Sequence, residues 1–171
     1  MSELRVGLGV DIHPFAPAGA RDEADRAPLV LGGVAFPGVT PLVGHSDADA
    51  VAHAVADAVL GAAGLGDLGT HFPDTDEKWQ GSDSLEILAA CLVLAAAEGW
   101  RLVNADCTIV AEAPRIAPVR AEMITRLSAA AGGPVHVKAT RPERLGSLGR
   151  TEGLACLAVV LLERAESASS R

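Results

Sequence analysis

Tyrosine is absent from this 171-residue sequence, and aromatic residues of all kinds make up only 3% of it. Apolar residues nevertheless make up 49% of the chain, so a folded core has to be built from alanine, valine, leucine and isoleucine. Small side chains of this kind give a thin core in a single domain. We therefore expect part of the apolar surface to be buried between the subunits of an assembly.

The sequence also has no long run of lysine or arginine, and its formal net charge is -8 at pH 7. Proteins that bind nucleic acid usually present a basic face to the phosphates, so we expect no nucleic-acid partner. An acidic protein can still bind a small phosphorylated ligand when metal ions and backbone N–H groups supply positive potential. No apolar stretch reaches the ~20 residues of a membrane span, so we expect no membrane segment.

Cysteine is scarce: Cys91, Cys107 and Cys156 lie far apart and form no C-x-x-C pair. An odd number of cysteines without a signal peptide is typical of reduced thiols in the cytoplasm. Each of the three lies in an apolar run, so we interpret them as core residues without a reactive role.

The remaining patterns predict a single α+β domain. Strand-like and helix-like segments interleave, which is typical of an α/β sandwich with a mixed sheet of about four strands and helices packed on one side. We expect this domain to span residues 1–164, followed by a polar, disordered tail over 165–171. The helix expected over 85–99 is aliphatic on more than one face, which predicts that it is well buried. Strands are expected over 4–10, 29–36 (a hairpin-like segment), 101–111, 135–139 and 154–162, and helices over 46–63, 85–99 and 119–131.

The clearest helix is expected to begin at Ser46. Ser46 can cap it, and Asp49 three residues later completes an S-x-x-D capping pattern, while Gly64 and Gly66 end the apolar run. The free N–H groups and the positive end of the helix dipole would then face a ligand beside His45 and Ser46. Alternatively, Ser46 and Asp49 serve only as caps.

The strongest candidate site is a metal centre. Asp11 and His13 stand two residues apart near the end of the first strand, so both side chains project to the same face. His53 lies in the predicted helix, one helical step from Asp49 and two from His45. One carboxylate and two imidazoles that leave an open position form a common catalytic zinc site. A solvated aspartate with two incidental histidines is the alternative, but D-x-H followed by H-S-D-x-D-x-x-x-H favours the metal.

Two further polar segments could bind a ligand. Asp67-Leu68-Gly69 with residues 72–76 offers carboxylates and hydroxyls for sugar-like hydroxyls or a hard cation, although a D-T-D string is more often an ordinary turn. Residues 139–143 with Arg150 combine a hydroxyl, a guanidinium and a carboxylate, which suit a phosphate and a second hard cation. An ordinary solvated turn is the alternative for this second segment.

Four strings together resemble a known enzyme family. They are GVDIHPF, GHSDADAVAHAVADAVLGAAGLGDLGTHFPDTD, DCTIVAEAPR and the closing KATxxExLGxxGRxEGLAC. In this order and spacing they are similar to the 2-C-methyl-D-erythritol 2,4-cyclodiphosphate synthases of the non-mevalonate isoprenoid pathway. The resemblance runs from about residue 5 to residue 162 and covers nearly the whole chain.

The resemblance implies a lyase that acts on a CDP-linked methylerythritol already carrying a 2-phosphate. That phosphate attacks the β-phosphorus, CMP leaves, and a cyclic diphosphate forms. By position, Asp11, His13 and His53 would bind Zn²⁺ against the β-phosphate, and His45 would stabilise the transition state. Glu143 would help to hold a second divalent cation, Mg²⁺ or Mn²⁺, that bridges the two phosphates.

The resemblance also implies where the rest of the substrate binds. Asp67 would hold the sugar-alcohol hydroxyls, with residues 72–76 beside it. Residues 111–117 and Thr140 would form the cytidine pocket, partly from a neighbouring subunit of a homotrimer with active sites between its subunits. The implied substrate-binding residues are Asp11, His13, His45, Ser46, Asp67, Leu68, Gly69, Phe72, Pro73, Asp74, Thr75, Asp76, Ala111, Glu112, Ala113, Pro114, Arg115, Ile116, Ala117, Thr140, Arg141, Pro142, Glu143, Ser147 and Arg150.

Two positions depart from the family pattern. Arg141 replaces a threonine with a transition-state role, and we expect its side chain to point inward and contact a phosphate as a catalytic residue. The alternatives are that it points outward to solvent or a neighbouring subunit, or that it forms an ion pair with Glu143. Ser147 replaces an aromatic residue near the trimer axis, which leaves open whether the central channel binds an apolar ligand. Two other activities remain possible on the same scaffold: a metal-dependent phosphoesterase, and a non-catalytic trimer that binds a metal or nucleotide.

Overall fold

The computed structural model describes residues 3–17, 28–44, 46–73, 79 and 81–165. Its strands are β1 (Leu4–Pro14), β2 (Leu29–Leu31), β3 (Val34–Phe36), β4 (Trp100–Val110), β5 (Val135–Thr140) and β6 (Gly153–Arg164). Its helices are α1 (Ala50–Ala63), α2 (Leu68–His71), α3 (Ser84–Ala97), α4 (Arg120–Ala131) and α5 (Gly146–Gly149).

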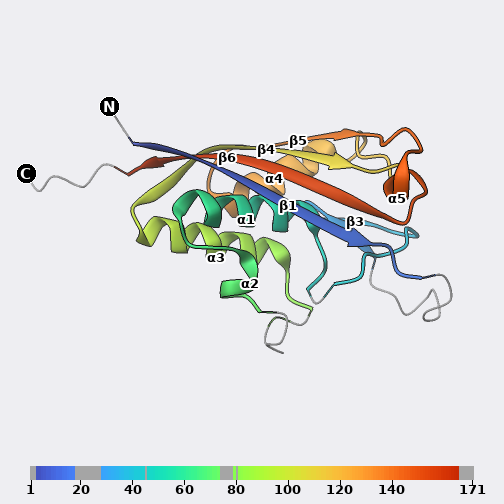
Figure 1. Ribbon diagram of the computed structural model, residues 1–171, viewed down its shortest axis with the longest axis horizontal. Helices are drawn as coiled ribbons and strands as arrows, with labels where there is room; N and C mark the ends of the chain where they lie inside the picture. Colours follow the sequence, from blue (N-terminus) through green and yellow to red (C-terminus); the bar gives the residue numbers. More distant parts are fainter. Residues whose placement is uncertain (1–2, 18–27, 45, 74–78, 80, 166–171) are drawn as a thin grey trace, which may run out of the picture.

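The main sheet is mixed and has the strand order β1-β6-β4-β5. Strand β6 is antiparallel to β1 and β4, whereas β4 and β5 are parallel, so β1, β4 and β5 all end at the same end of the sheet. The helices α1, α3 and α4 lie on one side of this sheet (Figure 1). The expected α+β domain with a four-stranded mixed sheet and helices on one side is confirmed.

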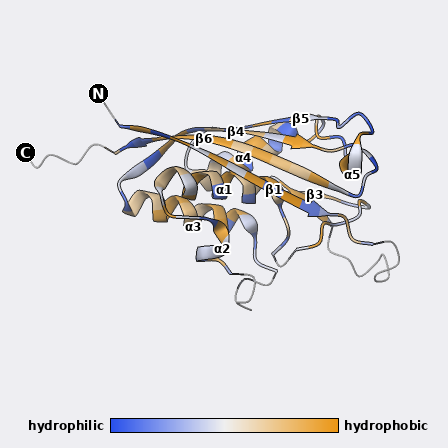
Figure 2. Cartoon of the chain, in the orientation of Figure 1, coloured by the Kyte–Doolittle hydropathy of each residue, from blue (hydrophilic) through white to orange (hydrophobic). Residues whose placement is uncertain are grey.

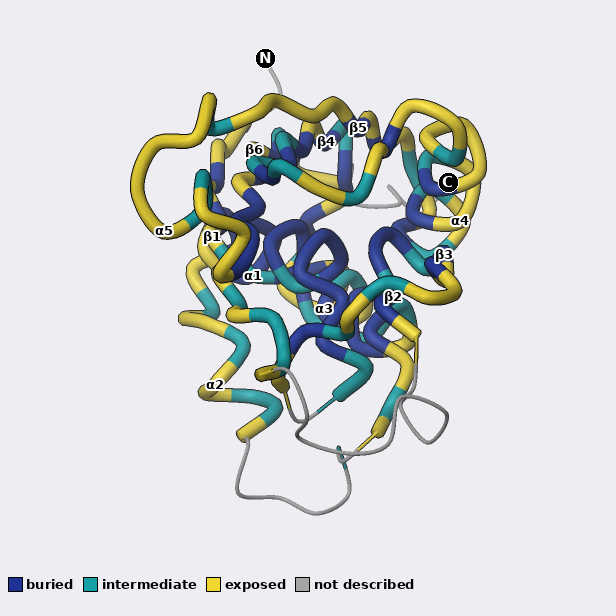
Figure 3. The backbone as a smooth tube through the Cα atoms, turned by 90° about the vertical axis from the view of Figure 1, so that its right-hand side faces the viewer, coloured by how far each residue is buried: buried dark blue, intermediate teal, exposed yellow. Residues whose placement is uncertain are grey.

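The opposite face of the sheet carries a row of uncovered apolar side chains. Alternate residues of β1 point to this face, and Leu8 on it is 62% exposed. Strand β6 continues the row, since Leu8 pairs with Val159 and Val10 with Leu157. Figure 2 shows the hydrophobic character of both strands, and Figure 3 shows α1 buried on the covered side. The exposed members of this apolar stripe are Leu4, Val6, Leu8, Val10, Ile12, Leu157 and Val159.

Helix α1 lies unusually close to β1 because two strand residues have no side chain. A Cβ atom on Gly7 would lie 2.0 Å from the carbonyl oxygen of Ala58, and one on Gly9 would lie 2.0 Å from that of Ala54. Any larger residue at either position would push the helix away. The same contacts make α1 antiparallel to β1, so the first turn of α1 meets the last residues of β1.

The buried carboxylate of Asp49 ties the start of α1 to the β2–β3 hairpin. Its Oδ1 accepts hydrogen bonds from the N–H groups of Gly32 (2.8 Å), Val51 (3.0 Å) and Ala52 (3.2 Å), and its Oδ2 accepts one from Gly33 (2.6 Å). The side chain is fully buried. Asp49 therefore caps the helix and closes the turn between two strands at once.

The expectation that Ser46 caps α1 is wrong. Asp49 is the capping residue, and Ala50 is the first residue of the helix. Ala48 has a positive φ of 55°, which is not helical, so the residues before it cannot belong to α1. At the other end the predicted stop is confirmed, because Gly64 ends α1 in the left-handed conformation with a φ of 77°.

Replacing Asp49 by alanine is expected to destabilise the fold strongly, because it leaves four N–H groups without their acceptor. A buried donor left unsatisfied costs about 1–3 kcal/mol, so a loss of at least 3 kcal/mol in the free energy of unfolding is expected. Urea denaturation measures it, with Asp83→Ala, which removes the exposed cap of α3, as the control. Equal losses in the two variants would contradict this role of Asp49.

The three cysteines are buried and form no disulfide, so their interpretation as core residues is confirmed. Burial raises the pKa of the Cys91 thiol to about 12, which leaves it protonated at neutral pH. A hydrogen bond to Cys107 and burial also raise the pKa of the Cys156 thiol, so neither Cys91 nor Cys156 presents a reactive thiolate.

Two expectations about helices need correction. Helix α3 is buried along one face only, at Ile87, Leu88, Cys91 and Ala95, while Val93 is 69% exposed. Because α3 is aliphatic all round, its sequence does not indicate which face is buried. The short helices α2 and α5 lie outside the three helices that the sequence predicts. No helix in the described part of the chain is both long and apolar enough to cross a membrane.

Candidate metal centre

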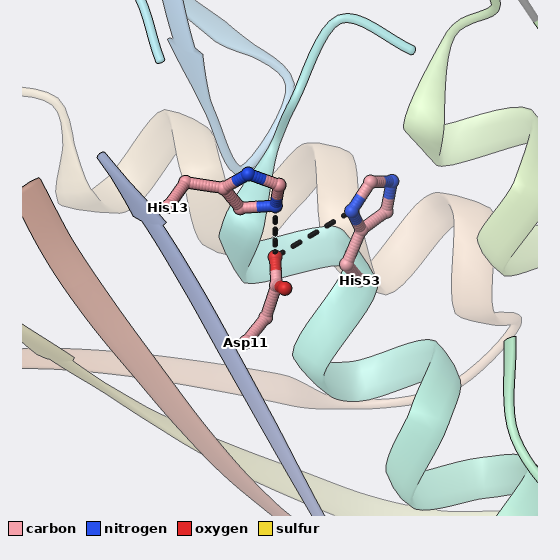
Figure 4. A group of neighbouring side chains, drawn as sticks. All are labelled: Asp11, His13 and His53. Atoms are coloured by element: carbon pink, nitrogen blue, oxygen red, sulfur yellow. Dashed lines mark ion pairs between the residues drawn. The ribbon is translucent and has the colours of Figure 1, made fainter. Parts of the chain in front are cut away.

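Asp11, His13 and His53 come together where α1 meets the end of β1 (Figure 4). Asp11 Oδ2 lies 2.9 Å from His13 Nε2 and 3.5 Å from His53 Nδ1. One potential ligand atom from each residue lies within 4.8 Å of the other two. Two residues on the same face of a strand and one residue of the facing helix turn thus form a single cluster, as the sequence predicted.

This cluster has the polar atoms that a metal ion needs. Asp11 Oδ2 and His13 Nε2 are buried side-chain atoms without a hydrogen-bond partner, although they lie only 2.9 Å apart. Buried polar atoms are almost always hydrogen-bonded, so two adjacent exceptions point to a ligand that binds both of them. An oxygen and two imidazole nitrogens around one point fit a divalent transition metal.

The electrostatics of the cluster also favour a cation. Burial raises the pKa of the Asp11 carboxyl, but the close contacts with His13 and His53 and their charge outweigh it and lower this pKa to about 2. The Asp11 carboxylate in turn raises the pKa of His13, against the opposing effect of burial. Asp11 is therefore ionised at neutral pH, and a metal ion would take the place of a proton beside it.

Neighbouring groups fix how both imidazoles are turned. His13 Nδ1 lies 2.7 Å from the carbonyl oxygen of Val43, and His53 Nε2 lies 2.9 Å from Ser84 Oγ. Ser84 in turn donates a hydrogen bond to Asp47. Sequence reasoning missed both Ser84 and Asp47, because Ser84 begins a different helix and no local spacing links it to His53.

The segment before α1 differs from expectation. The N–H groups of Val51 and Ala52 bond to Asp49, so these two groups are not available to a phosphate. Ser46 does lie at the cluster, with its Oγ 3.2 Å from His53 Nε2. His45, the predicted transition-state residue, lies outside the described residues.

The predicted sugar-binding segment lies beside α1. Asp67 caps α2, and its Oδ1 accepts hydrogen bonds from Thr70 N (2.9 Å) and Thr70 Oγ1 (2.7 Å). The next residue, Leu68, donates its N–H to Asp57 Oδ1 at 3.2 Å. Because Asp57 is one helical turn beyond His53, this contact joins α2 to the same part of α1.

Other residues of that segment are only partly described. Phe72 packs edge-on against Trp79, with ring centroids 4.8 Å apart. Gly69 lies in α2, and Pro73 follows Phe72. The predicted residues Asp74, Thr75 and Asp76 lie outside the described residues.

A second cluster forms where β4 and β5 end. Ala111 N donates to the carbonyl oxygen of Thr140 at 3.1 Å, which joins the two predicted cytidine-binding segments. Glu112 Oε2 accepts from Arg141 Nη2 (2.7 Å) and Nε (2.9 Å), and its Oε1 accepts from Arg144 N (2.6 Å). These contacts lower the pKa of Glu112, and the hydrogen bond from Arg144 N has the largest effect. Arg141 thus forms its ion pair with Glu112 rather than with Glu143.

The remaining predicted residues surround this second cluster. Ala113 and Pro114 are joined by a cis peptide bond, and Ile116 is buried. Glu143 is exposed and adopts a positive φ of 54°. Arg150 Nε donates to Glu152 Oε1 at 2.7 Å. The exposed residues Arg115 and Ala117, the half-buried Pro142 and the exposed Ser147 complete the set.

The two clusters lie at opposite edges of the sheet. Asp11 pairs with Cys156, Cys156 with Ile109, and Ile109 with Ala139, so one row of residues crosses all four strands. Neighbouring strands are about 4.8 Å apart, which separates Asp11 from Ala139 by roughly 14 Å. The metal cluster of one chain therefore does not adjoin the Thr140 segment of the same chain.

Several known proteins match this chain along nearly its whole length. The chain is 51% identical over 164 residues to a protein named 2-C-methyl-D-erythritol 2,4-cyclodiphosphate synthase from Geobacillus kaustophilus, covering 94% of this chain and 99% of the relative. A solved structure described as an IspF CDP complex from Plasmodium falciparum matches with a TM-score of 0.79 and 28% identity, over 97% of this chain and 99% of that one. The bifunctional IspDF of Campylobacter jejuni matches with a TM-score of 0.87 and 35% identity, over 96% of this chain and 43% of that one. Residues 4–163 match the YgbB family, and the chain therefore belongs to that family.

Proposed function

We propose that this protein converts 4-CDP-2-C-methyl-D-erythritol 2-phosphate into 2-C-methyl-D-erythritol 2,4-cyclodiphosphate and CMP. The observation that carries the proposal is the Asp11–His13–His53 cluster in a chain that matches a named synthase along nearly its whole length. In this reaction an oxygen of the 2-phosphate forms a bond to the β-phosphorus. The bond from that phosphorus to the CMP oxygen breaks, and CMP leaves with the bonding electrons.

The attacking group belongs to the substrate, so the protein needs no activated serine or cysteine. A bound divalent cation supplies positive charge to the phosphoryl oxygens. Asp11, His13 and His53 would hold that cation, and the Val43 carbonyl turns His13 Nε2 toward it. The main task of the other residues is to hold two phosphates of one substrate in contact, which is an effect of positioning.

We assign zinc to this cluster, because one carboxylate and two imidazoles with an open position suit Zn²⁺. Glu143 is the proposed ligand of a second cation, Mg²⁺ or Mn²⁺, since a carboxylate and phosphate oxygens suit a hard ion. His45 would stabilise the transition state, and Asp67 would bind the sugar-alcohol hydroxyls. The segment 111–117 with Thr140 would bind cytidine.

We further propose a homotrimer whose active sites lie between subunits. The apolar stripe on β1 and β6 supports it, because monomeric proteins rarely expose a continuous apolar surface of this kind. The distance between the two clusters of one chain supports it too, since a neighbouring chain could bring its Thr140 segment to the metal cluster. Free, buried thiols are consistent with a cytoplasmic location.

Release of CMP from the CDP-linked substrate tests the proposal. Purified protein with Zn²⁺ and Mg²⁺ is expected to release CMP, to lose this activity after treatment with a chelator, and to regain it when zinc is restored. Binding of the nucleotide without any release of CMP would instead support a non-catalytic binding protein.

Replacing Arg141 by alanine is expected to lower the rate of CMP release about tenfold or more. Although Arg141 pairs with Glu112, its side chain is still 67% exposed, so its permanent positive charge can also contact a phosphate. Initial rates measure the effect, with Arg120→Ala, the loss of an exposed arginine at the start of α4, as the control. Equal turnover in Arg141→Ala and the parent would exclude Arg141 from the catalytic apparatus.

A further inference from the structure

The two ring nitrogens of His53 have different surroundings. Nδ1 faces the metal cluster, 3.5 Å from Asp11 Oδ2. Nε2 points away from it, 2.9 Å from Ser84 Oγ and 3.2 Å from Ser46 Oγ. A neutral imidazole carries its hydrogen on only one nitrogen, and only the other nitrogen can bind a metal. The group that sets the position of this hydrogen therefore decides whether His53 can act as a ligand.

The Ser84 hydroxyl sets that position because its own hydrogen is already used. A carboxylate can only accept hydrogen bonds, so the hydroxyl of Ser84 donates to Asp47 Oδ1. A hydroxyl has a single hydrogen, which leaves the Ser84 oxygen as an acceptor toward His53. Ser84 therefore favours the tautomer with the hydrogen on Nε2, where the Ser46 oxygen, 3.2 Å away, can accept it too, and the lone pair of Nδ1 then points into the metal cluster.

Asp47 and Ser84 are themselves held firmly. The Ser84 side chain is fully buried at the first position of α3, and its N–H donates to Asp47 Oδ2 at 3.4 Å. Asp47 Oδ1 also accepts from Asp49 N at 3.2 Å, and Asp47 N donates to the Ser82 carbonyl at 3.2 Å. These bonds connect the segment before α1 to the start of α3, so the acceptor of His53 cannot rotate freely.

We propose that Ser84 and Asp47 are positioning residues that keep the hydrogen of His53 on Nε2 and so present Nδ1 as a metal ligand. The proposal rests on the proposed function only in that a metal binds at this cluster. His13 makes an informative contrast, because its orienting acceptor is the backbone carbonyl of Val43, which a side-chain substitution leaves in place. The orientation of His53 depends on side chains and can be removed by mutation. Loss of a partner that orients a metal ligand typically weakens metal binding about 10–100-fold.

Zinc affinity measured by competition with a chelator tests this role. Ser84→Ala is expected to weaken zinc binding about tenfold or more, while Ser84→Thr, which keeps the hydroxyl, retains most of the affinity. Asp47→Asn keeps the shape of Asp47 and is expected to cause a smaller loss, because an amide oxygen is a weaker acceptor. Ser128→Ala is the matched control, since Ser128 Oγ accepts from Val135 N at 3.0 Å in a different part of the fold.

A spectroscopic measurement separates this role from a merely structural one. Nitrogen-15 NMR of the metal-free protein is expected to show the hydrogen of His53 on Nε2 in the parent and in Ser128→Ala, and a mixture of tautomers in Ser84→Ala. Unchanged zinc affinity together with an unchanged tautomer in Ser84→Ala would overturn the proposal. If the parent binds no zinc, the proposed metal site fails, but the tautomer measurement still decides the role of Ser84.

Discussion

Replacing His53 by alanine is expected to remove most of the bound zinc and nearly all CMP release while the fold remains intact. The substitution deletes one of three predicted ligands, so the loss of metal affinity should exceed the ~10–100-fold that follows from losing a supporting residue. The fold should persist because His53 lies on a partly exposed face of α1, where alanine is the best helix former. Metal analysis and circular dichroism of the purified variant measure the two effects.

His136 provides the control for this experiment. It is an exposed histidine on β5 and is not part of the metal cluster, so His136→Ala should retain zinc. Full zinc stoichiometry in His53→Ala would contradict the assignment of His53 as a ligand. Loss of zinc with unchanged CMP release would contradict the part that the metal plays in the proposed function.

Replacing Leu8 by glutamate is expected to break the proposed trimer into folded monomers and to abolish most of its activity. Leu8 lies in the middle of the apolar stripe and is paired with Val159. In the single chain it is already 62% exposed, so the substitution should change the stability of the monomer by no more than about 0.5 kcal/mol. In an interface the new carboxylate would be buried without a partner, which costs several kcal/mol and opposes association.

Val93→Glu is the matched control for Leu8→Glu. Val93 is 69% exposed, but it belongs to α3, on the covered side of the sheet, and not to the strands that carry the apolar stripe. Light scattering should therefore find a trimer for the parent and for Val93→Glu, and a monomer for Leu8→Glu. A stable, active monomer of the parent protein at micromolar concentration would contradict the proposed assembly.

The sequence predicted the metal cluster because its geometry follows from local periodicity. Side chains two residues apart on β1 share a face, and the helix that carries His53 could be recognised from its apolar run. What sequence could not supply was the distance between the strand and the helix. Gly7 and Gly9 create that close approach, and glycine within a strand does not reveal which element lies against it.

The errors concern residues whose roles depend on partners distant in the sequence. Ser46 and Asp49 both fit a capping pattern, and Asp49 prevails because the β2–β3 hairpin also donates to its carboxylate. Ser84 contacts His53 only because α3 packs beside α1. The sequence allows Arg141 to pair with its near neighbour Glu143, but the turn places it beside Glu112, on the segment after β4.

Phosphorus NMR of the products tests the central claim most directly. The parent protein, given the CDP-linked substrate with Zn²⁺ and Mg²⁺, is expected to yield CMP and a cyclic diphosphate whose two phosphorus atoms are coupled within one ring. A metal-dependent hydrolase would use water as the attacking group and would give CMP with a linear phosphate. Formation of the ring in amounts equal to CMP is the result that the proposed function predicts, and CMP with only linear products would contradict it.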